Sequence, residues 1–123
     1  MEKRIGQKGF TLIEIIAVLV ILGILAAVAI PKYQDLKDQA GIKSADGAAA
    51  AGQSLVSMAY SKLMLENNGT VPAVGDIVTE AACGTNVTGD FTVTCTAGTG
   101  EISIVAVSKT NPAYTSTKTW TLP

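Results

Sequence analysis

Few side chains in this chain of 123 residues could support catalysis or metal binding. There is no histidine, the commonest general base and the commonest metal ligand. The two cysteines, Cys83 and Cys95, are too few for a thiolate metal site and too far apart for a C-x-x-C redox motif. The acids are scattered, and no Gly-rich phosphate loop is present. We therefore expect no enzymatic activity, no catalytic residue, no metal and no cofactor.

One acid, Glu14, lies at the leading edge of a long apolar run. Residues 15–30 are sixteen consecutive apolar or glycine positions. A helix over residues 10–30 would be about 31 Å long, close to the roughly 30 Å hydrocarbon thickness of a bilayer. The run is apolar on every face, as lipid or a filament core requires. We predict that residues 10–31 form a helix that spans a membrane or lies in the core of a filament.

Positive charge lies on the N-terminal side of this run. Residues 1–9 hold three basic residues and one acid, which leaves six basic and nine acidic residues, a net charge of −3, for residues 10–123. Positive flanks stay in the cytoplasm, so the C-terminal part is expected to cross the membrane. The acidic balance argues against nucleic acid as a partner, because phosphate binding draws on clustered Lys and Arg.

The same pattern also fits an ordinary secretory signal peptide. A basic start, an apolar stretch and the small residues 27–29 together match a signal that is cut after Ala29. That interpretation makes the mature protein a secreted, β-rich binding domain. Glu14 weakens it, because a simple export signal has no use for an acid at that position.

Residues 8–14, with the sequence K-G-F-T-L-I-E, form a specific motif that opens the apolar run. The motif resembles the processing site of type IV prepilins and of the pseudopilins of type II secretion, and the resemblance extends over residues 8–36. It implies that a prepilin peptidase cuts after Gly9 and N-methylates Phe10. Residues 1–9 would then be a cleaved leader peptide. Residues 10–31, which we call the anchor, would stay on the mature protein.

The resemblance also assigns roles inside the anchor. A helix places Glu14 one turn from Phe10 on the same face, where its carboxylate needs a partner in apolar surroundings. The new α-amine of a neighbouring subunit would supply that partner, which makes Glu14 an assembly residue. Gly23 and Pro31 are two weak points in the helix. We expect the stretch between them to unwind on assembly, as it does in similar pilins.

Residues 32–67 are expected to continue the helix with an amphipathic character. Small residues fill positions 45–52, where another element could approach closely, but the glycines lower helix propensity and we expect the helix to be loose near 41–47. Residues 67–69, N-N-G, form a helix stop.

Residues 68–123 are rich in threonine and show period-two alternation of apolar and polar residues around 91–96, 101–106 and 119–122. We predict an antiparallel β-meander whose apolar face packs on the C-terminal half of the helix. The fold class is then α+β, an arrangement that the resemblance also implies.

Cys83 and Cys95 fit a disulfide, because the anchor sends this region out of the cytoplasm and only one pairing is available within the chain. Many type IV pilins carry a C-terminal disulfide, whereas major pseudopilins more often bind calcium. The cysteine pair therefore favours a pilin over a pseudopilin.

Two N-glycosylation sequons begin at Asn68 and Asn86. Glu66 stands two residues before Asn68, as bacterial oligosaccharyltransferases often require. Asn68 is therefore a candidate glycosylation site, although its place in a helix stop also accounts for it.

The sequence as a whole predicts a structural subunit of a type IV pilus-like surface filament. The expected partners are other copies of the chain in a helical filament, the prepilin peptidase, the inner-membrane assembly machinery and, before assembly, the membrane in a single pass. The mature protein is expected outside the cell, in a filament used for adhesion or motility. A pseudopilin of type II secretion is the alternative within the family.

Overall fold

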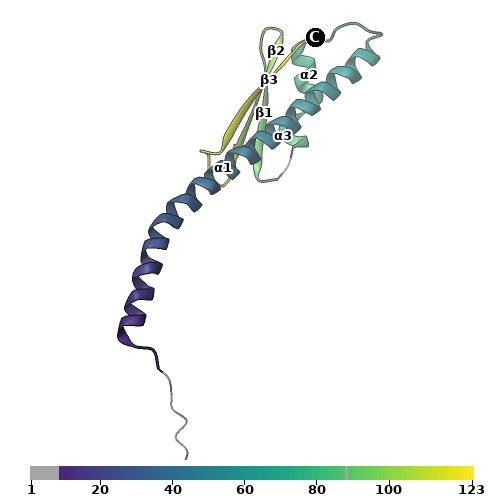
Figure 1. Ribbon diagram of the computed structural model, residues 1–123. Coiled ribbons are helices and arrows are strands. Elements are labelled where there is room, and N and C mark those ends of the chain that lie inside the picture. The colour runs from purple at the N-terminus through teal and green to yellow at the C-terminus, as the bar shows by residue number, and fades with distance from the viewer. Residues whose placement is uncertain (1–8, 88) are drawn as a thin grey trace, which may run out of the picture. The chain divides into compact units, whose positions relative to one another are not determined.

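The computed structural model describes residues 9–87 and 89–123 (Figure 1). The long helix α1 (Leu12–Glu66) is followed by the short helices α2 (Val74–Ala81) and α3 (Cys83–Asn86) and the strands β1 (Phe91–Ala97), β2 (Glu101–Ser108) and β3 (Thr115–Thr121). The chain divides into two compact units, one that ends at Lys37 and one that comprises Asp38–Pro123. The predicted α+β fold class is confirmed. Residues 1–8 of the predicted leader lie outside the described residues.

The described part of the first unit is helical from Leu12 onward and has no buried residue. Fourteen large apolar side chains between Phe10 and Ile30 are 47–85% exposed. This is the one stretch among the described residues that is long and apolar enough to cross a membrane. Pro31 lies inside the helix rather than at its end. The alanines just before it are strong helix formers, so the helix persists despite the missing backbone donor.

The second unit is built around the C-terminal half of α1, which the small residues at 45–52 bring close to the sheet. Ala45 and Ala49 are fully buried, and a Cβ on Gly52 would lie 2.8 Å from Ile104 Cγ2. The helix is unbroken across residues 41–47 because this face is packed. At Gly41, a Cβ would overlap the ring of Tyr114. Gly41 and Gly52 therefore allow close packing, and the expected loosening of the helix near 41–47 is wrong.

The sheet is an antiparallel meander in the order β1-β2-β3, as predicted. Its inner face contributes the buried residues Val93, Ile102, Ile104 and Ala106 to the core. The threonines that alternate with the inward-facing positions of β1 and β3 are exposed. Since successive side chains of a strand point to opposite faces, the period-two pattern correctly identified the inner face.

Helices α2 and α3 were not predicted, and they occupy the first part of the region that was expected to be β-structure. Helix α2 places Ile77 and Ala81 in the core, with Val74 and Val78 packed against it. These four residues follow the helical spacing i, i+3, i+4, i+7, a signal that the sequence does contain. The left-handed Ala82, with φ of 43°, separates the two helices.

Polar contacts hold α1 to Tyr114 just before β3, to β3 itself and to α2. The Tyr114 hydroxyl donates a hydrogen bond of 2.8 Å to Asp38 Oδ1, and the Ser116 hydroxyl donates to Asp46 Oδ1. The Trp120 indole donates to Ser57 Oγ at 3.0 Å. On the α2 side, Lys62 pairs with Glu80.

Candidate functional site

The predicted cleavage point lies in an accessible, non-helical segment just before α1. Gly9 and Phe10 are both exposed, and Phe10 has 85% of its surface accessible. A Cβ added at Gly9 would meet no atom within 4 Å. Nothing in the described part of the fold therefore requires glycine at this position. A requirement for glycine would have to come from a molecule that binds this segment, such as a peptidase whose active site admits no side chain.

Glu14 has a partner within its own helix. The Thr11 backbone N–H donates to Glu14 Oε2 at 2.6 Å, and the Thr11 hydroxyl donates to the same oxygen at 2.9 Å. The Glu14 N–H donates in return to the Thr11 hydroxyl at 3.3 Å. This reciprocal arrangement is a capping box, which satisfies N–H groups that the first helical turn leaves unpaired.

The capping box was missed in the sequence analysis, although its signature T-x-x-E is present at residues 11–14. Both hydrogen bonds from Thr11 end on Oε2, so the cap does not occupy Oε1 of Glu14. The cap thereby holds the Glu14 carboxylate at the first turn of α1 and leaves its Oε1 available to another donor.

A shallow hollow of about 430 Å³ lies beside this carboxylate, lined by Phe10, Glu14, Ile15, Val18 and Leu19. Its lining is apolar apart from Glu14. In a single chain these side chains face water, where their exposure is unfavourable. Such a surface is suited to contact with lipid or with another apolar helix.

Gly23 and Pro31 lie further along the same exposed helix. A Cβ on Gly23 would meet no atom within 4 Å, so the glycine is not required by packing within the chain. Both residues are helical here. Their predicted role in unwinding concerns the assembled filament and stays a prediction.

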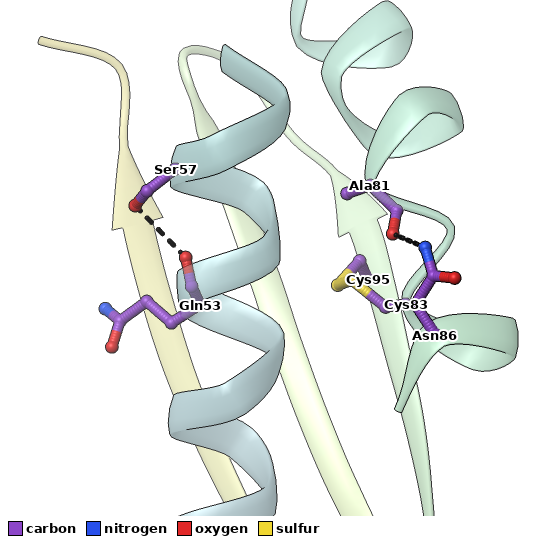
Figure 2. The surroundings of a disulfide bond; sticks show 6 residues. All are labelled: Gln53, Ser57, Ala81, Cys83, Asn86 and Cys95. Carbon is purple, nitrogen blue, oxygen red and sulfur yellow. Dashed lines mark hydrogen bonds between the residues drawn. A yellow bond between two sulfur atoms is a disulfide. The ribbon is translucent and has the colours of Figure 1, made fainter. Parts of the chain in front are cut away.

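In the second unit, a disulfide joins Cys83 of α3 to Cys95 of β1, with a Cα–Cα distance of 5.9 Å (Figure 2). Cys83 is buried, with 3% of its surface accessible. Beside it, the Asn86 side-chain amide donates to the Ala81 carbonyl at 2.9 Å (Figure 2). The disulfide and this hydrogen bond fix the short α3 next to the edge of the sheet.

Asn68 lies in the exposed turn that ends α1. It adopts a left-handed conformation with φ of 52°, followed by Gly69 with φ of 85°. The Gly69 N–H donates to the Met64 carbonyl at 2.8 Å, a pairing typical of helix C-termini. The predicted helix stop at residues 67–69 is thus confirmed.

Three titratable groups of the second unit are perturbed by these contacts. The hydrogen bond from Ser116 holds the pKa of Asp46 below its usual value. The hydrogen bond and charge of Glu80 raise the pKa of Lys62. The hydrogen bond that Tyr114 donates to Asp38 raises the pKa of the Tyr114 hydroxyl. Each shift reflects a contact that fastens α1 to its neighbours.

The structure thus brings Gly9, Phe10 and Glu14 together at one end of α1. Cys83, Cys95 and Asn68 belong to the other unit. Within residues 9–87 and 89–123, no three His, Cys, Asp or Glu side chains gather in a group that could hold a metal ion.

Comparison with known proteins finds similarity to pilins and to a processing motif at the N-terminus of the chain. The prokaryotic N-terminal methylation motif matches residues 4–30. The type IV narrow pilus major component PilA5 of Thermus thermophilus is 52% identical over 52 residues, which cover 42% of this chain and 45% of that protein. The type IV major alpha-pilin of Moraxella bovis is 48% identical over 54 residues, 44% of this chain and 34% of that protein.

A longer match is to fimbrial protein Q of Moraxella bovis, which is 40% identical over 86 residues, 68% of this chain and 51% of that protein. The chain thus spans between a third and about half of the length of these relatives. No solved structure matches it significantly. The methylation motif and the shared N-terminal segment place the chain in the type IV pilin family.

Proposed function

We propose that this chain is a structural subunit of a type IV pilus-like surface filament. It is made as a precursor, cut after Gly9, N-methylated at Phe10 and then polymerised through residues 10–31. The observation that carries the proposal is the exposed apolar N-terminal segment of α1 beside an accessible processing motif. The relatives named as pilins and fimbrial proteins support a pilus rather than an enzyme.

The apolar surface requires two different environments in turn. Burying one large apolar side chain is worth about 1.5–3 kcal/mol, and fourteen of them are exposed between Phe10 and Ile30. In the precursor, lipid covers this surface in a single membrane pass. In the filament, the same segments of neighbouring subunits cover it. Both environments remove this surface from water, so the hydrophobic stabilisation is kept when the subunit passes from one to the other.

Processing keeps the anchor on the product. The positive charges before Gly9 hold the leader on the cytoplasmic side, where a prepilin peptidase reaches the peptide bond between Gly9 and Phe10. The assembly machinery of the inner membrane then extracts the mature subunit and adds it to the filament. The second unit stays outside the cytoplasm throughout, and the mature protein ends on the cell surface.

Glu14 directs the addition of each subunit. Cleavage creates a charged amine on Phe10, which is costly to leave unpaired in apolar surroundings. The capping box holds Oε2 of Glu14 and leaves Oε1 to accept a hydrogen bond from the amine of the next subunit. A correct axial offset satisfies both charges, and a slipped offset leaves both without a partner. The pair therefore sets the register of the filament.

The N-terminus of the mature protein tests this proposal. We expect protein sheared from the cell surface to begin at N-methylated Phe10, and the Gly9→Leu variant to remain uncut in the membrane. A mature chain that begins at Ile30 would instead establish the secreted domain with a signal peptide. Electron microscopy of a deletion strain provides the second test: loss of long surface filaments supports the pilus, and their persistence contradicts it.

A further inference from the structure

We propose that Asn68 carries an N-linked glycan whose first sugars rest on the apolar surface formed by Tyr60, Met64 and Leu65. The proposal relies on the proposed function only in requiring that the second unit be exported. Three observations support it. Asn68 and its neighbours are exposed, the Asn86 amide of the second sequon is hydrogen-bonded, and a hollow lies directly beside Asn68.

The sequon at residues 68–70 is fully exposed. All six residues from Glu66 to Val71 are exposed, and the turn lies at the end of α1, where helices fray most readily. A transferase must draw the acceptor segment into its own site. Here that costs few contacts, mainly the hydrogen bonds of the Gly69 and Thr70 N–H groups. Neither position 69 nor position 71 is proline, so the segment can extend.

At the second sequon, Asn86 is also exposed, but its side chain and its segment are held by other contacts. The Asn86 amide nitrogen already donates to the Ala81 carbonyl, and α3 is tied to β1 through Cys83 (Figure 2). The residue two positions before Asn86 is Gly84, whereas the residue two before Asn68 is the acid Glu66. The chain therefore contains one acceptor in an exposed turn at a helix end and, as an internal comparison, one whose amide is hydrogen-bonded in a segment tied by a disulfide.

A hollow of about 520 Å³ adjoins Asn68 and is lined by Tyr60, Ser61, Met64, Leu65, Asn68 and Gly69. Leu65 is 83% exposed. Tyr60 is the aromatic side chain that lines the hollow, and its ring stands 5.5 Å from that of Trp120. The apolar face of a sugar ring packs well on aromatic and aliphatic side chains. A glycan on Asn68 would cover surface that is otherwise unfavourably exposed.

In the proposed reaction, the oligosaccharide is transferred to Asn68 from a lipid-linked oligosaccharide, which is the second reactant. Asn68 Nδ2 forms a bond to the anomeric carbon of the first sugar, and the bond from that carbon to the diphosphate oxygen breaks. The amide nitrogen gives up one proton, and the polyprenyl diphosphate leaves. No oxidant or reductant is consumed.

The test uses full-length protein sheared from the surface of the cells that make it. Cleavage after glutamate separates residues 67–80, with Asn68, from residues 81–101, with Asn86. We expect the first peptide to carry the mass of a glycan and the second to be unmodified. The added mass should be lost in Asn68→Asp, which tolerates the left-handed conformation, and in Thr70→Ala. It should remain in Thr70→Ser and Thr88→Ala.

An unmodified 67–80 peptide from a chain that begins at Phe10 would overturn this proposal and leave the filament function intact. A modification that persists in Asn68→Asp would also overturn it, because the sugar would then be linked to a hydroxyl. Peroxide oxidation tests whether the glycan packs on the hollow. Met64 should oxidise more slowly in the glycosylated protein than in Asn68→Asp, while Met58, which is 67% exposed, should oxidise equally in both. Equal rates at Met64 would contradict the packing of the glycan on this surface.

Discussion

At the residue scale, Glu14 has two distinct physical tasks. One is visible in the single chain, where its carboxylate caps α1 together with Thr11. The other belongs to the proposed filament, where the same carboxylate meets the amine of a neighbour. The two tasks are compatible because the cap engages Oε2 alone. They can be separated by mutation, since Thr11 takes part only in the cap.

We predict that Glu14→Ala is inserted and cut normally but yields few filaments. The unpaired amine of the neighbour would cost about 3–5 kcal/mol, as is usual when one partner of a buried charge pair is removed. Glu14→Asp should be partly impaired, because its carboxylate is one methylene short. Filament yield by shearing and immunoblotting measures the effect.

Thr11→Ala is the matched control for that experiment. It removes the hydroxyl part of the cap, which is worth about 1 kcal/mol, but leaves the Glu14 carboxylate and its hydrogen bond from the backbone N–H of residue 11. We expect filaments from Thr11→Ala at close to normal yield. Normal filaments from Glu14→Ala would show that the charge pair does not set the register.

The residues of the proposed site could be found from sequence because they lie within one short segment. Gly9, Phe10 and Glu14 belong to a contiguous motif, so no long-range folding was needed to bring them together. The capping role of Glu14 was local too, and its signature was overlooked in favour of the assembly role. By contrast, the packing of Tyr114 on Gly41 joins residues far apart in the chain, so no local sequence pattern predicts it.

At the scale of elements, the small residues of α1 set how closely the helix approaches the sheet. Gly52 is the tightest contact between them, with Ile104 Cγ2 and Val93 Cγ1 at 2.8 and 2.9 Å from the place of a Cβ. Gly47 lies in the same helix with open space at that position. The two glycines therefore provide a matched comparison.

We predict that Gly52→Ala destabilises the second unit by about 1–3 kcal/mol, because the added methyl group overpacks the core. Gly47→Ala should instead stabilise it by up to about 1 kcal/mol through helix propensity. Urea unfolding of the detergent-solubilised full chain measures both changes. Equal effects of the two substitutions would contradict the close contact at Gly52.

The disulfide joins residues separated by 12 positions and ties α3 to β1. We predict that replacing Cys83 and Cys95 together by serine lowers the free energy of unfolding by roughly 3 kcal/mol. Such subunits should be degraded before assembly, which immunoblotting of cell fractions would reveal. Alkylation of surface protein should detect no free thiol, and two free thiols would contradict the bond.

The anchor part of α1 is continuous in the single chain, yet Gly23 and Pro31 weaken it. In lipid, the peptide groups between them must pair internally, which keeps the stretch helical. In a filament, neighbouring chains can supply partners. We predict that this stretch unwinds on assembly and lengthens the subunit. A filament map with unbroken helical hydrogen bonds from Phe10 to Leu36 would refute the prediction.

The sequence predicted the long helix and the three strands because their periodicity or composition is strong and continuous. Helices α2 and α3 were missed because they have only eight and four residues. Isolated helices of that length are marginal in water, so local propensity says little about them. They form because Ile77 and Ala81 enter the core and because Cys83 is tied to the sheet.

At the scale of the whole molecule, the stability of the second unit should depend on pH at both extremes. The lowered pKa of Asp46 implies a stabilisation that is present above the unfolded pKa, near 3.9, and is lost as pH falls through the folded value. The raised pKa values of Lys62 and Tyr114 imply stabilisation that is present below about pH 10 and is lost as pH rises through their folded values.

We therefore predict a plateau of thermal stability between about pH 4 and pH 10. Asp46→Asn should flatten the acid limb, and Tyr114→Phe should flatten the alkaline limb, because each removes one titrating contact. Melting temperatures measured across this range check both expectations. Unchanged limbs in the two variants would show that these contacts do not contribute to the pH dependence.

The position of Trp120 has a practical consequence for optical measurements. It is the only tryptophan of the chain, and its indole donates to Ser57 of α1 and stands 5.5 Å from the Tyr60 ring. Its fluorescence therefore reports on the junction of β3 with α1 and receives no direct signal from the anchor, which contains no second indole. Separation of strand and helix can be followed by the emission of this native fluorophore, in detergent or in intact filaments, without attaching a dye.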